Sequence, residues 1–206
     1  MSGPLFDPPD LKVANPPAGV SSSEPDRASP SGEIQPLPPP PVELTYLVGP
    51  DRERAVPALK DGFEGIYRWH AKRTLRTATW VRAATLRGEV VAVSVLERLD
   101  PEVGYVYYLS TMQSHRRTGL GGLLLDDALA LFRREGATVA FGAAEEENVP
   151  SIALFRSRGF RPVERKELGF REGGLGAWGL RSRMTLVGGE VLLGLRIAPS
   201  AHHGGP

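Results

Sequence analysis

The sequence predicts an α/β domain built on a sheet of mixed strand direction. Segments rich in β-branched and aromatic residues alternate with segments of helical periodicity, and glycine or proline separates most of them. A third observation limits where the domain lies, because twelve of the 19 prolines fall within residues 1–41. Such a segment buries too little apolar area to offset its ordering entropy. We therefore expect residues 1–41 to be disordered, residues 42–198 to form the domain and residues 199–206 to be a flexible tail.

Several segments have the apolar, β-branched and aromatic content of strands. In chain order they are Glu43–Val48, Thr79–Leu86, Val90–Leu99, Gly104–Met112, Thr138–Ala144, Phe160–Glu164 and Arg183–Val187. The second and third of these strands are joined by Arg87, Gly88 and Glu89, a turn sequence that is typical of a β-hairpin.

The segments between the strands are expected to be helical. Two short helices are expected within residues 51–75, because proline and glycine interrupt the weak apolar periodicity there. Leu120–Glu135 is the clearest helix, with leucine, alanine and phenylalanine on one face and Gly136 at its end. Pro150–Arg158 is expected to be a short helix with proline at an early position.

The amino-acid composition excludes several kinds of chemistry and several classes of partner. The chain has no cysteine, which excludes disulfides, cysteine-ligated zinc, iron–sulfur clusters and thiol nucleophiles. With 25 basic and 24 acidic side chains, the formal charge of +1 gives no overall field that would attract nucleic acid or anionic lipid. No apolar run approaches the roughly 20 residues that span a bilayer, and the N-terminus lacks the regions of a leader peptide. We therefore expect a cytoplasmic protein without a metal and without a nucleic-acid or membrane partner.

The most informative segment is the turn between a predicted strand and the clearest helix. Gly119, Gly121 and Gly122 lie at the helix start, where backbone N–H groups can approach a ligand and the helix dipole adds about half a positive charge. Arg116 and Arg117 precede them, so the turn is predicted to bind an anion. Neither a Walker A loop nor a dinucleotide fingerprint matches, because leucines follow Gly122 where lysine or glycine would be needed.

Two motifs resemble those of one family. Arg116–Gly121, with the sequence RRTGLG, resembles the [Q/R]-x-x-G-x-[G/A] motif of the GNAT family of acyl-CoA-dependent N-acyltransferases. Asn148–Phe160, with the sequence NVPSIALFRSRGF, is similar to that family's N-x-x-[SA]-x-x-L-Y-x-x-x-G-F. The resemblance implies a GNAT-like mixed, mostly antiparallel sheet of about six to seven strands, flanked by about four helices. It also implies that the sheet splays open after the strand ending near Met112, where the pantetheine arm of acyl-CoA binds.

The resemblance implies a set of cofactor-binding residues. Backbone groups of Leu109 and Thr111 would hold the pantetheine arm like an added strand, and the amides of residues 117–122 would hold the pyrophosphate. The implied residues are Leu109, Thr111, Arg116, Arg117, Thr118, Gly119, Gly121, Gly122, Asn148, Ser151 and Phe155. The implied co-substrate is acetyl-CoA, and the implied partner is an amine-bearing small molecule or a protein amine. Homodimers are frequent among relatives, so a homodimer is a further expectation.

The proton acceptor of the reaction is open. An amine attacks a thioester only when it is neutral, so a base or a desolvating pocket must release its proton. The positions where family members carry a catalytic glutamate are Ala143 and Tyr105 in this chain. Four glutamates lie nearby in the sequence and are candidates that act through ordered water: Glu102, Glu145, Glu146 and Glu147. We favour Glu145 because it lies near the end of its strand beside the gap, and the alternative is that Glu145–Glu147 is a solvated acidic loop.

The proton donor is open as well. The backbone N–H of Leu109 can stabilise charge that develops on the thioester oxygen. The tyrosine that many family members use as general acid is replaced by Phe155, which has no proton to give. Ser151 is our candidate for the acid, and the alternatives are water, the amine's own proton or one of the tyrosines at 105, 107 and 108.

Aromatic residues are candidates for the acceptor pocket. These are Tyr67, Trp69, Trp80 and Tyr107, and for each of them packing in the core is the alternative. The departures from the family at catalytic positions leave a second hypothesis for the function. It is an acyl-CoA-binding sensor, or a partner-binding module, that has the same shape but no efficient turnover.

Overall fold

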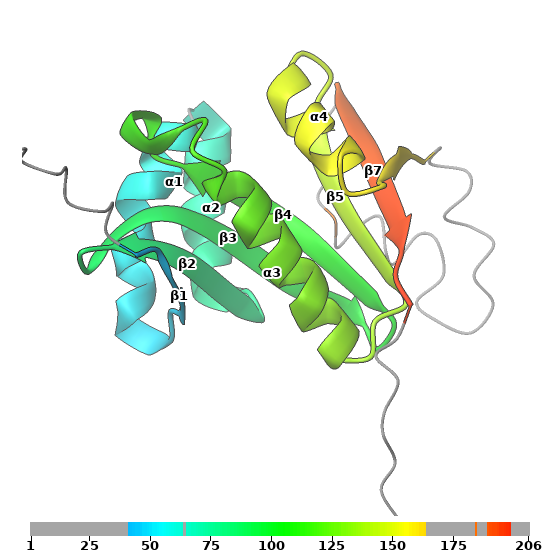
Figure 1. Cartoon of the computed structure of the whole chain (residues 1–206), viewed down its shortest axis with the longest axis horizontal. Coiled ribbons are helices and arrows are strands. Elements are labelled where there is room, and N and C mark those ends of the chain that lie inside the picture. Colours follow the sequence, from blue (N-terminus) through cyan, green and yellow to red (C-terminus); the bar gives the residue numbers. More distant parts are fainter. Residues whose placement is uncertain (1–40, 64, 164–183, 185–188, 199–206) are drawn as a thin grey trace, which may run out of the picture. The chain divides into compact units, whose positions relative to one another are not determined.

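Figure 1 shows a computed structural model of the chain, which describes residues 41–63, 65–163, 184 and 189–198. The predictions for residues 1–40 and 199–206 lie outside the described residues. In chain order the elements are β1 (Glu43–Tyr46), the 3-10 helix η1 (Gly49–Ala55), α1 (Val56–Gly62), α2 (Gly65–Thr77), β2 (Trp80–Leu86), β3 (Glu89–Asp100), β4 (Val103–Thr111), η2 (Gln113–His115), α3 (Leu120–Arg134), β5 (Val139–Glu145), α4 (Val149–Arg156), β6 (Arg161–Pro162) and β7 (Glu190–Arg196).

The strands form one seven-stranded sheet in the order β1-β2-β3-β4-β5-β7-β6. It is mostly antiparallel, and α1 to α4 accompany it, so the predicted fold class is confirmed. The two short helices expected before the hairpin are α1 and α2. None of the helices in the described ranges is long and apolar enough to cross a bilayer.

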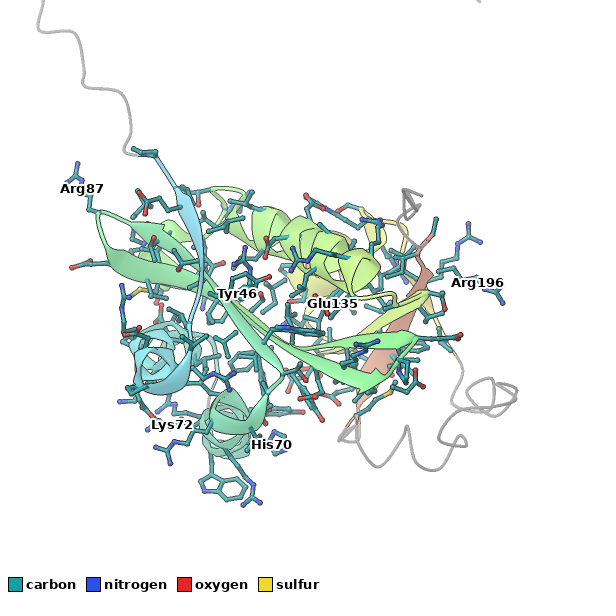
Figure 2. All side chains as sticks on the ribbon, turned by 90° about the horizontal axis from the view of Figure 1, so that it is seen from below. Tyr46, His70, Lys72, Arg87, Glu135 and Arg196 are labelled. Carbon is teal, nitrogen blue, oxygen red and sulfur yellow. The ribbon has the colours of Figure 1, made fainter. Side chains whose placement is uncertain are left out.

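Helices cover both faces of the sheet, with the strands between them (Figure 2). On one face, Leu59 of α1 belongs to the same buried cluster as Val93 and Val95 of β3. On the other face, Phe132 of α3 belongs to a cluster with Leu96. Residues of β3 thus alternate between the two layers, as the strand period of two requires. Each fully buried leucine or phenylalanine contributes roughly 1.5–3 kcal/mol to stability.

The sheet opens between β4 and β5. These strands are the parallel pair, and their register runs only from Val103 opposite Val139 to Val106 opposite Gly142. Beyond that point β4 remains paired with β3 on its other side as far as Thr111, while β5 continues separately. The two strands therefore part after Val106 (Figure 1), which confirms the predicted splay of the sheet.

The predicted strand Phe160–Glu164 is shorter than expected. Only Arg161–Pro162 is extended and paired, as β6, and Glu164 lies outside the described residues. A proline in so short a strand fits its place at the edge of the sheet, because proline cannot donate a ladder hydrogen bond.

The last strand differs from the prediction. A strand was expected at residues 183–187, but Met184, the described residue of that range, has helical geometry. The strand is instead β7, between β5 and β6, and the sequence analysis missed it. Gly194 interrupts its apolar pattern. A Cβ at Gly194 would lie 2.9 Å from the ring of Phe141, so the glycine is needed for close packing inside the sheet.

Two ion pairs position α3. Arg82 of β2 donates from Nε and Nη2 to both carboxylate oxygens of Asp127, at 2.6 and 2.7 Å, and its guanidinium lies 3.9 Å from the ring centroid of Tyr46. Asp126 accepts two hydrogen bonds from Arg158, which follows α4, at 3.0 Å each. The first pair ties α3 to the sheet, and the second ties α3 to the segment after α4.

Candidate active site

The turn between β4 and α3 presents backbone amides that the helix does not use. The first amide bonded within α3 is that of Leu123, which donates to the carbonyl of Gly119 at 3.0 Å. The amides of residues 119–122 therefore stand before the hydrogen-bond ladder of the helix. Within the described ranges, the amides of Arg117 and Thr118 have no backbone partner either. The amides of residues 117–122 are thus available to an anion at the positive end of a helix.

The backbone of this turn has an unusual conformation. Arg117 and Gly119 have positive φ angles of 64° and 86°. A positive φ is uncommon for a residue with a side chain, and alternation of left-handed residues turns successive N–H groups toward a common point. The hydroxyl of Thr118 donates to the carbonyl of His115 at 2.6 Å, which holds the turn in this shape.

The three glycines of the turn serve different purposes. Gly119 has open space around the position of a Cβ, so its positive φ is what requires glycine. A Cβ at Gly121 would lie 3.2 Å from Cδ2 of Leu154, and a Cβ at Gly122 would lie 2.5 Å from Nη2 of Arg158. Gly121 and Gly122 therefore allow the α4 segment to approach the first turn of α3.

One edge of β4 faces the opening of the sheet. The N–H of Met112 donates to the carbonyl of Val91 at 2.9 Å, so the backbone groups of Met112 face β3. Backbone groups of alternate residues face opposite edges of a strand, so those of Leu109 and Thr111 face the edge from which β5 has separated. The predicted pairing of a pantetheine arm with Leu109 and Thr111, like an added strand, depends on this edge.

A β-bulge gathers tyrosines on one face of β4. The register steps from Val95 opposite Tyr108 to Leu96 opposite Val106, which leaves Tyr107 as the extra residue. Without the bulge, Tyr107 and Tyr108 would point to opposite faces. Their ring centroids lie 6.2 Å apart in a stacked arrangement, and the ring of Tyr105 meets that of Tyr107 edge-on at 4.8 Å.

Helix α2 adds a histidine to the tyrosines. His70 Nδ1 lies 2.6 Å from the hydroxyl of Tyr108 and 3.2 Å from Oγ1 of Thr74. Burial, and then the charge of Arg73, lower the pKa of His70 below its usual 6.5, so the ring is neutral at pH 7. Burial, and then the charge of Glu190, raise the pKa of Tyr108, so its hydroxyl keeps its proton. The two side chains therefore form a neutral hydrogen bond.

Two carboxylates lie at the adjoining ends of β5 and β7. Glu145 and Glu190 are directly opposite each other in the antiparallel register. Burial, and then the charges of Glu190 and Glu145, raise the pKa of Tyr67, which lies on α2. Burial followed by Glu190 also raises the pKa of Tyr105. Glu190 was missed in the sequence because it lies outside both motifs, in a strand that was not predicted.

The structure separates the four aromatic candidates for the acceptor pocket. Tyr67 and Tyr107 lie with the two glutamates and the tyrosine cluster. Trp80 packs on the opposite face of the sheet, with its centroid 6.2 Å from that of Phe132. Trp69 is 63% exposed and has the guanidinium of Arg73 6.0 Å from its ring centroid. Trp80 and Trp69 are therefore not brought together with the other two.

The second motif forms the start of α4 and part of the core. Asn148 is the N-cap of α4, and its Oδ1 accepts from the N–H of Ser151 at 3.2 Å. Phe155 is buried, meets Phe160 edge-on at 5.0 Å, and covers Gly142 of β5 so closely that a Cβ there would clash with its ring. The contacts of Asn148, Ser151 and Phe155 with a cofactor stay predictions.

Arg116 uses its guanidinium within the protein. Its Nε donates to the carbonyl of Thr111 at 3.3 Å and its Nη2 to that of Asp61 at 3.1 Å, so the side chain ties the end of β4 to α1. A phosphate contact of Arg116 stays a prediction.

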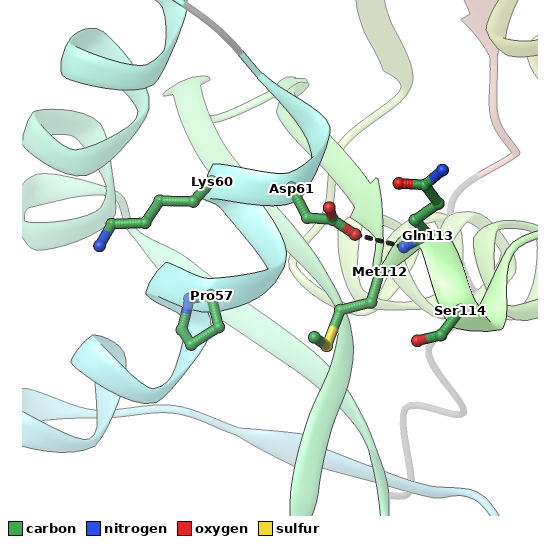
Figure 3. Close-up of a pocket in the computed structure, with 6 residues that line it drawn as sticks. All are labelled: Pro57, Lys60, Asp61, Met112, Gln113 and Ser114. Atoms are coloured by element: carbon green, nitrogen blue, oxygen red, sulfur yellow. Dashed lines mark hydrogen bonds between the residues drawn. The ribbon is translucent and has the colours of Figure 1, made fainter.

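A pocket of about 680 Å³ lies beside this contact. It is lined by Pro57, Lys60, Asp61, Met112, Gln113 and Ser114 (Figure 3). The Asp61 carboxylate accepts from the N–H of Gln113 inside it. The pocket includes neither the amides of residues 117–122 nor the tyrosine cluster, so we place the candidate active site elsewhere, at the opening of the sheet.

A sheet that opens beside a strand edge and an amide-presenting turn defines this molecule as an α/β protein suited to hold an extended, phosphate-bearing ligand. A family model described as "Acetyltransferase (GNAT) family" matches residues 45–160. The chain belongs to the GNAT acetyltransferase family, whose fold supports acyl transfer from acyl-CoA. No curated protein was found that matches the chain.

Solved structures share the fold. One is the ribosomal-protein-S18-alanine N-acetyltransferase from Escherichia coli, at 16% identity and a TM-score of 0.59, covering 79% of this chain and 97% of that chain. A second is a GNAT family acetyltransferase from Elizabethkingia anophelis with acetyl-CoA bound. It has 14% identity and a TM-score of 0.57, and the match covers 76% of this chain and 98% of that chain. A third is an acetyltransferase from Bacillus subtilis in complex with CoA. It has 16% identity and a TM-score of 0.56, and the match covers 77% of this chain and 100% of that chain. At these identities the likeness shows the fold alone.

Proposed function

We propose that the protein is an N-acetyltransferase that moves an acetyl group from acetyl-CoA to a primary amine by direct attack. The observation that carries the proposal is the continuity of the open β4 edge, at Leu109 and Thr111, with the turn amides of residues 117–122. An extended arm that ends in a diphosphate fits both parts at once. The solved relatives that contain acetyl-CoA or CoA support this choice of ligand.

The backbone holds the co-substrate in this proposal. The backbone of Leu109 and the N–H of Thr111 pair with the pantetheine arm as a strand would, while the Thr111 carbonyl accepts from Arg116. The amides of residues 117–122, helped by Arg117 and the dipole of α3, bind the pyrophosphate. The N–H of Leu109 stabilises the charge that develops on the thioester oxygen, because a donor fixed in the sheet needs no reorientation during the reaction.

The acceptor amine loses a proton before it attacks, since a lysine-like amine has a pKa near 10.4. Glu145 receives that proton in the proposal. The nitrogen then forms a bond to the carbonyl carbon, the carbon–sulfur bond breaks, and the thiolate takes a proton for which Ser151 is the candidate donor. One ammonium and one acetyl-CoA thus give one amide, one CoA thiol and one proton released to solvent.

An acyl-CoA sensor without efficient turnover is the second candidate. The observation that favours it is Phe155, which occupies the position of the family's tyrosine acid with its ring buried in the core. A sensor of this kind would bind acyl-CoA as described above and would release no thiol.

The test combines calorimetry with a thiol-detecting reagent. Acetyl-CoA should bind to the purified full chain, and a panel of primary amines should cause amine-dependent release of CoA thiol. Binding without amine-dependent release would favour the sensor, and no binding would reject both functions.

A pair of variants tests the backbone contact of Leu109. Leu109→Pro removes the N–H that faces the open edge and no ladder bond to β3, so it should lower kcat by about 100-fold. Leu109→Ala keeps that N–H and is the matched control. Circular dichroism checks that both variants fold. Equal rates for the two variants would reject the assigned role.

A further inference from the structure

The outer face of α2 carries a continuous group of basic side chains around one tryptophan. Arg68, Trp69, Lys72, Arg73 and Arg76 are exposed, and they recur about one turn apart, which places them on one side of the helix. We call these five residues the basic face of α2. The helix contains no aspartate or glutamate, so its own sequence does not offset this charge. Figure 2 shows Lys72 on the side of α2 that points away from the sheet.

The opposite side of α2 is packed in the core. Ala71 and Leu75 are buried in the cluster that α2 shares with α1 and the sheet. His70 contacts Tyr108 of β4. The apolar side of the helix is therefore already covered, so it does not enter a bilayer as the apolar side of a membrane-surface helix does.

Two of the cations make contacts within the protein and stay exposed. Arg68 donates to the carbonyls of Phe63 and Lys60, at 2.9 and 3.4 Å, and because carbonyls are neutral its charge is not neutralised. Arg76 forms an ion pair with Glu53 at 3.1 Å, in which both side chains are more than half exposed. These contacts fix the ends of the basic face and leave most of its charge in place.

The middle of the basic face has the composition of a protein interface. Among the residues that the structure describes, Lys72 and Arg73 form no ion pair with a carboxylate. The guanidinium of Arg73 lies 6.0 Å from the ring centroid of Trp69, and this tryptophan is 63% exposed. Tryptophan is usually well buried in a folded chain, and tryptophan and arginine are enriched where proteins bind each other.

We propose that the basic face of α2 is a docking surface for an acidic segment of a protein partner. Carboxylates complement its charge, and arginine can bind a carboxylate through two hydrogen bonds. Successive turns of a helix are about 5.4 Å apart, close to the roughly 6.6 Å between alternate side chains of an extended peptide. An extended segment with aspartate or glutamate at every second position therefore fits the face.

A nucleic acid fits the same face less well. The formal charge of the whole chain is +1, so basic and acidic side chains nearly balance outside this face, whereas domains that bind nucleic acid are strongly basic. Proteins that bind single strands stack successive bases on several aromatic rings, and the basic face has Trp69 alone. These two observations favour a protein partner.

The binding test uses two short labelled peptides, one that alternates glutamate with serine and one that alternates glutamine with serine. Fluorescence anisotropy with the full chain should show the acidic peptide binding at least about tenfold more tightly at low salt. Added salt should weaken this binding, because it screens exposed charges. Equal binding of both peptides would overturn the proposal, and so would a single-stranded RNA of the same net charge that binds at least as tightly as the acidic peptide.

Two double variants with the same net charge locate the surface. Lys72→Gln with Arg73→Gln should weaken binding of the acidic peptide by at least about tenfold. Arg87→Gln with Arg196→Gln removes two exposed cations that lie away from α2 (Figure 2), and it should change the affinity by less than about twofold. Circular dichroism checks that both variants fold. Equal affinities of the two variants would show that binding follows overall charge and would overturn the proposal.

Trp69→Ala separates the ring from the charge. It keeps every cation and removes the exposed aromatic surface, so binding of the acidic peptide should weaken by at least about fivefold. Unchanged affinity would overturn the docking surface as defined. None of these measurements uses acyl transfer, so their results are independent of the proposed function.

Discussion

The two sides of the candidate active site are built in different ways. The proposed cofactor side consists of backbone groups from one continuous segment, the end of β4 and the turn into α3. The proposed acceptor side consists of side chains from α2, β4, β5 and β7, which are far apart in the sequence. A binding site made of backbone groups depends on the local conformation of the chain, so its sequence carries a motif of glycines. A binding site made of side chains depends on the order of the strands in the sheet, so it has no local motif in the sequence.

The largest effect should come from a charge placed in the cofactor side. Gly121→Glu introduces a carboxylate beside the turn amides, and like-charge contacts cost several kcal/mol, so acetyl-CoA affinity should fall by about 100-fold or more in calorimetry. Leu123→Glu puts the same charge on the exposed side of the same helical turn and should bind nearly normally. Unchanged affinity in Gly121→Glu would show that the diphosphate does not lie at this turn.

The next effect concerns the scaffold of the cofactor side. Asp127→Ala leaves Arg82 without its carboxylate, and both side chains are largely buried, at 9% and 17% exposure. Removing one partner of a buried ion pair should destabilise the protein by about 3 kcal/mol in urea unfolding. Replacing the pair with Arg82→Met and Asp127→Leu together should recover much of that loss. A loss below about 1 kcal/mol in the single variant would mean that α3 does not depend on this pair.

A smaller effect is expected on the acceptor side, and it depends on pH. The pKa of His70 is lowered in the folded protein, so the unfolded chain binds the proton more readily. Stability should therefore fall as the pH drops through about 6.5, and His70→Gln should show a flatter dependence between pH 8 and pH 5. Urea midpoints across this range measure both slopes. Parallel slopes in the two proteins would contradict the assignment.

The smallest effect should come from Asp126, the neighbour of Asp127. Hydrogen bonding to Arg158 lowers the pKa of Asp126, so its contribution is present above about pH 4 and is lost as the pH falls through the lowered value. The pair is partly exposed, so Asp126→Ala should cost less than about 1 kcal/mol at pH 7. A cost as large as that of Asp127→Ala would remove the distinction between the buried and the exposed pair.

The local geometry of the turn between β4 and α3 could be predicted because its determinants are local. The positive φ of Gly119 requires glycine just before a helix start, and such a requirement is visible in the sequence. The splay of the sheet was predicted through the family resemblance. The contact of Arg116 with two carbonyls was not predicted, because the carbonyl of Asp61 comes close only when α1 packs beside the end of β4.

The acceptor side resisted prediction for a physical reason. Tyr67 and Trp80 look equally suited to a pocket in the sequence, and only the side of the sheet on which each packs separates them. The tyrosines gather because of the bulge at Tyr107, which an alternating pattern of side chains does not reveal. Glu190 was missed together with β7, whose apolar pattern is interrupted by Gly194.

The half-paired edge of β4 has a consequence for hydrogen–deuterium exchange. The backbone amide of Ser110 faces β3, and that of Leu109 faces the opening of the sheet. These two neighbouring amides of β4 should therefore differ in their protection from exchange. The Leu109 amide should exchange quickly in the free protein and slow down when a ligand supplies the missing partner, while the Ser110 amide should stay slow throughout. Binding would then be recorded as an alternating pattern along a single strand.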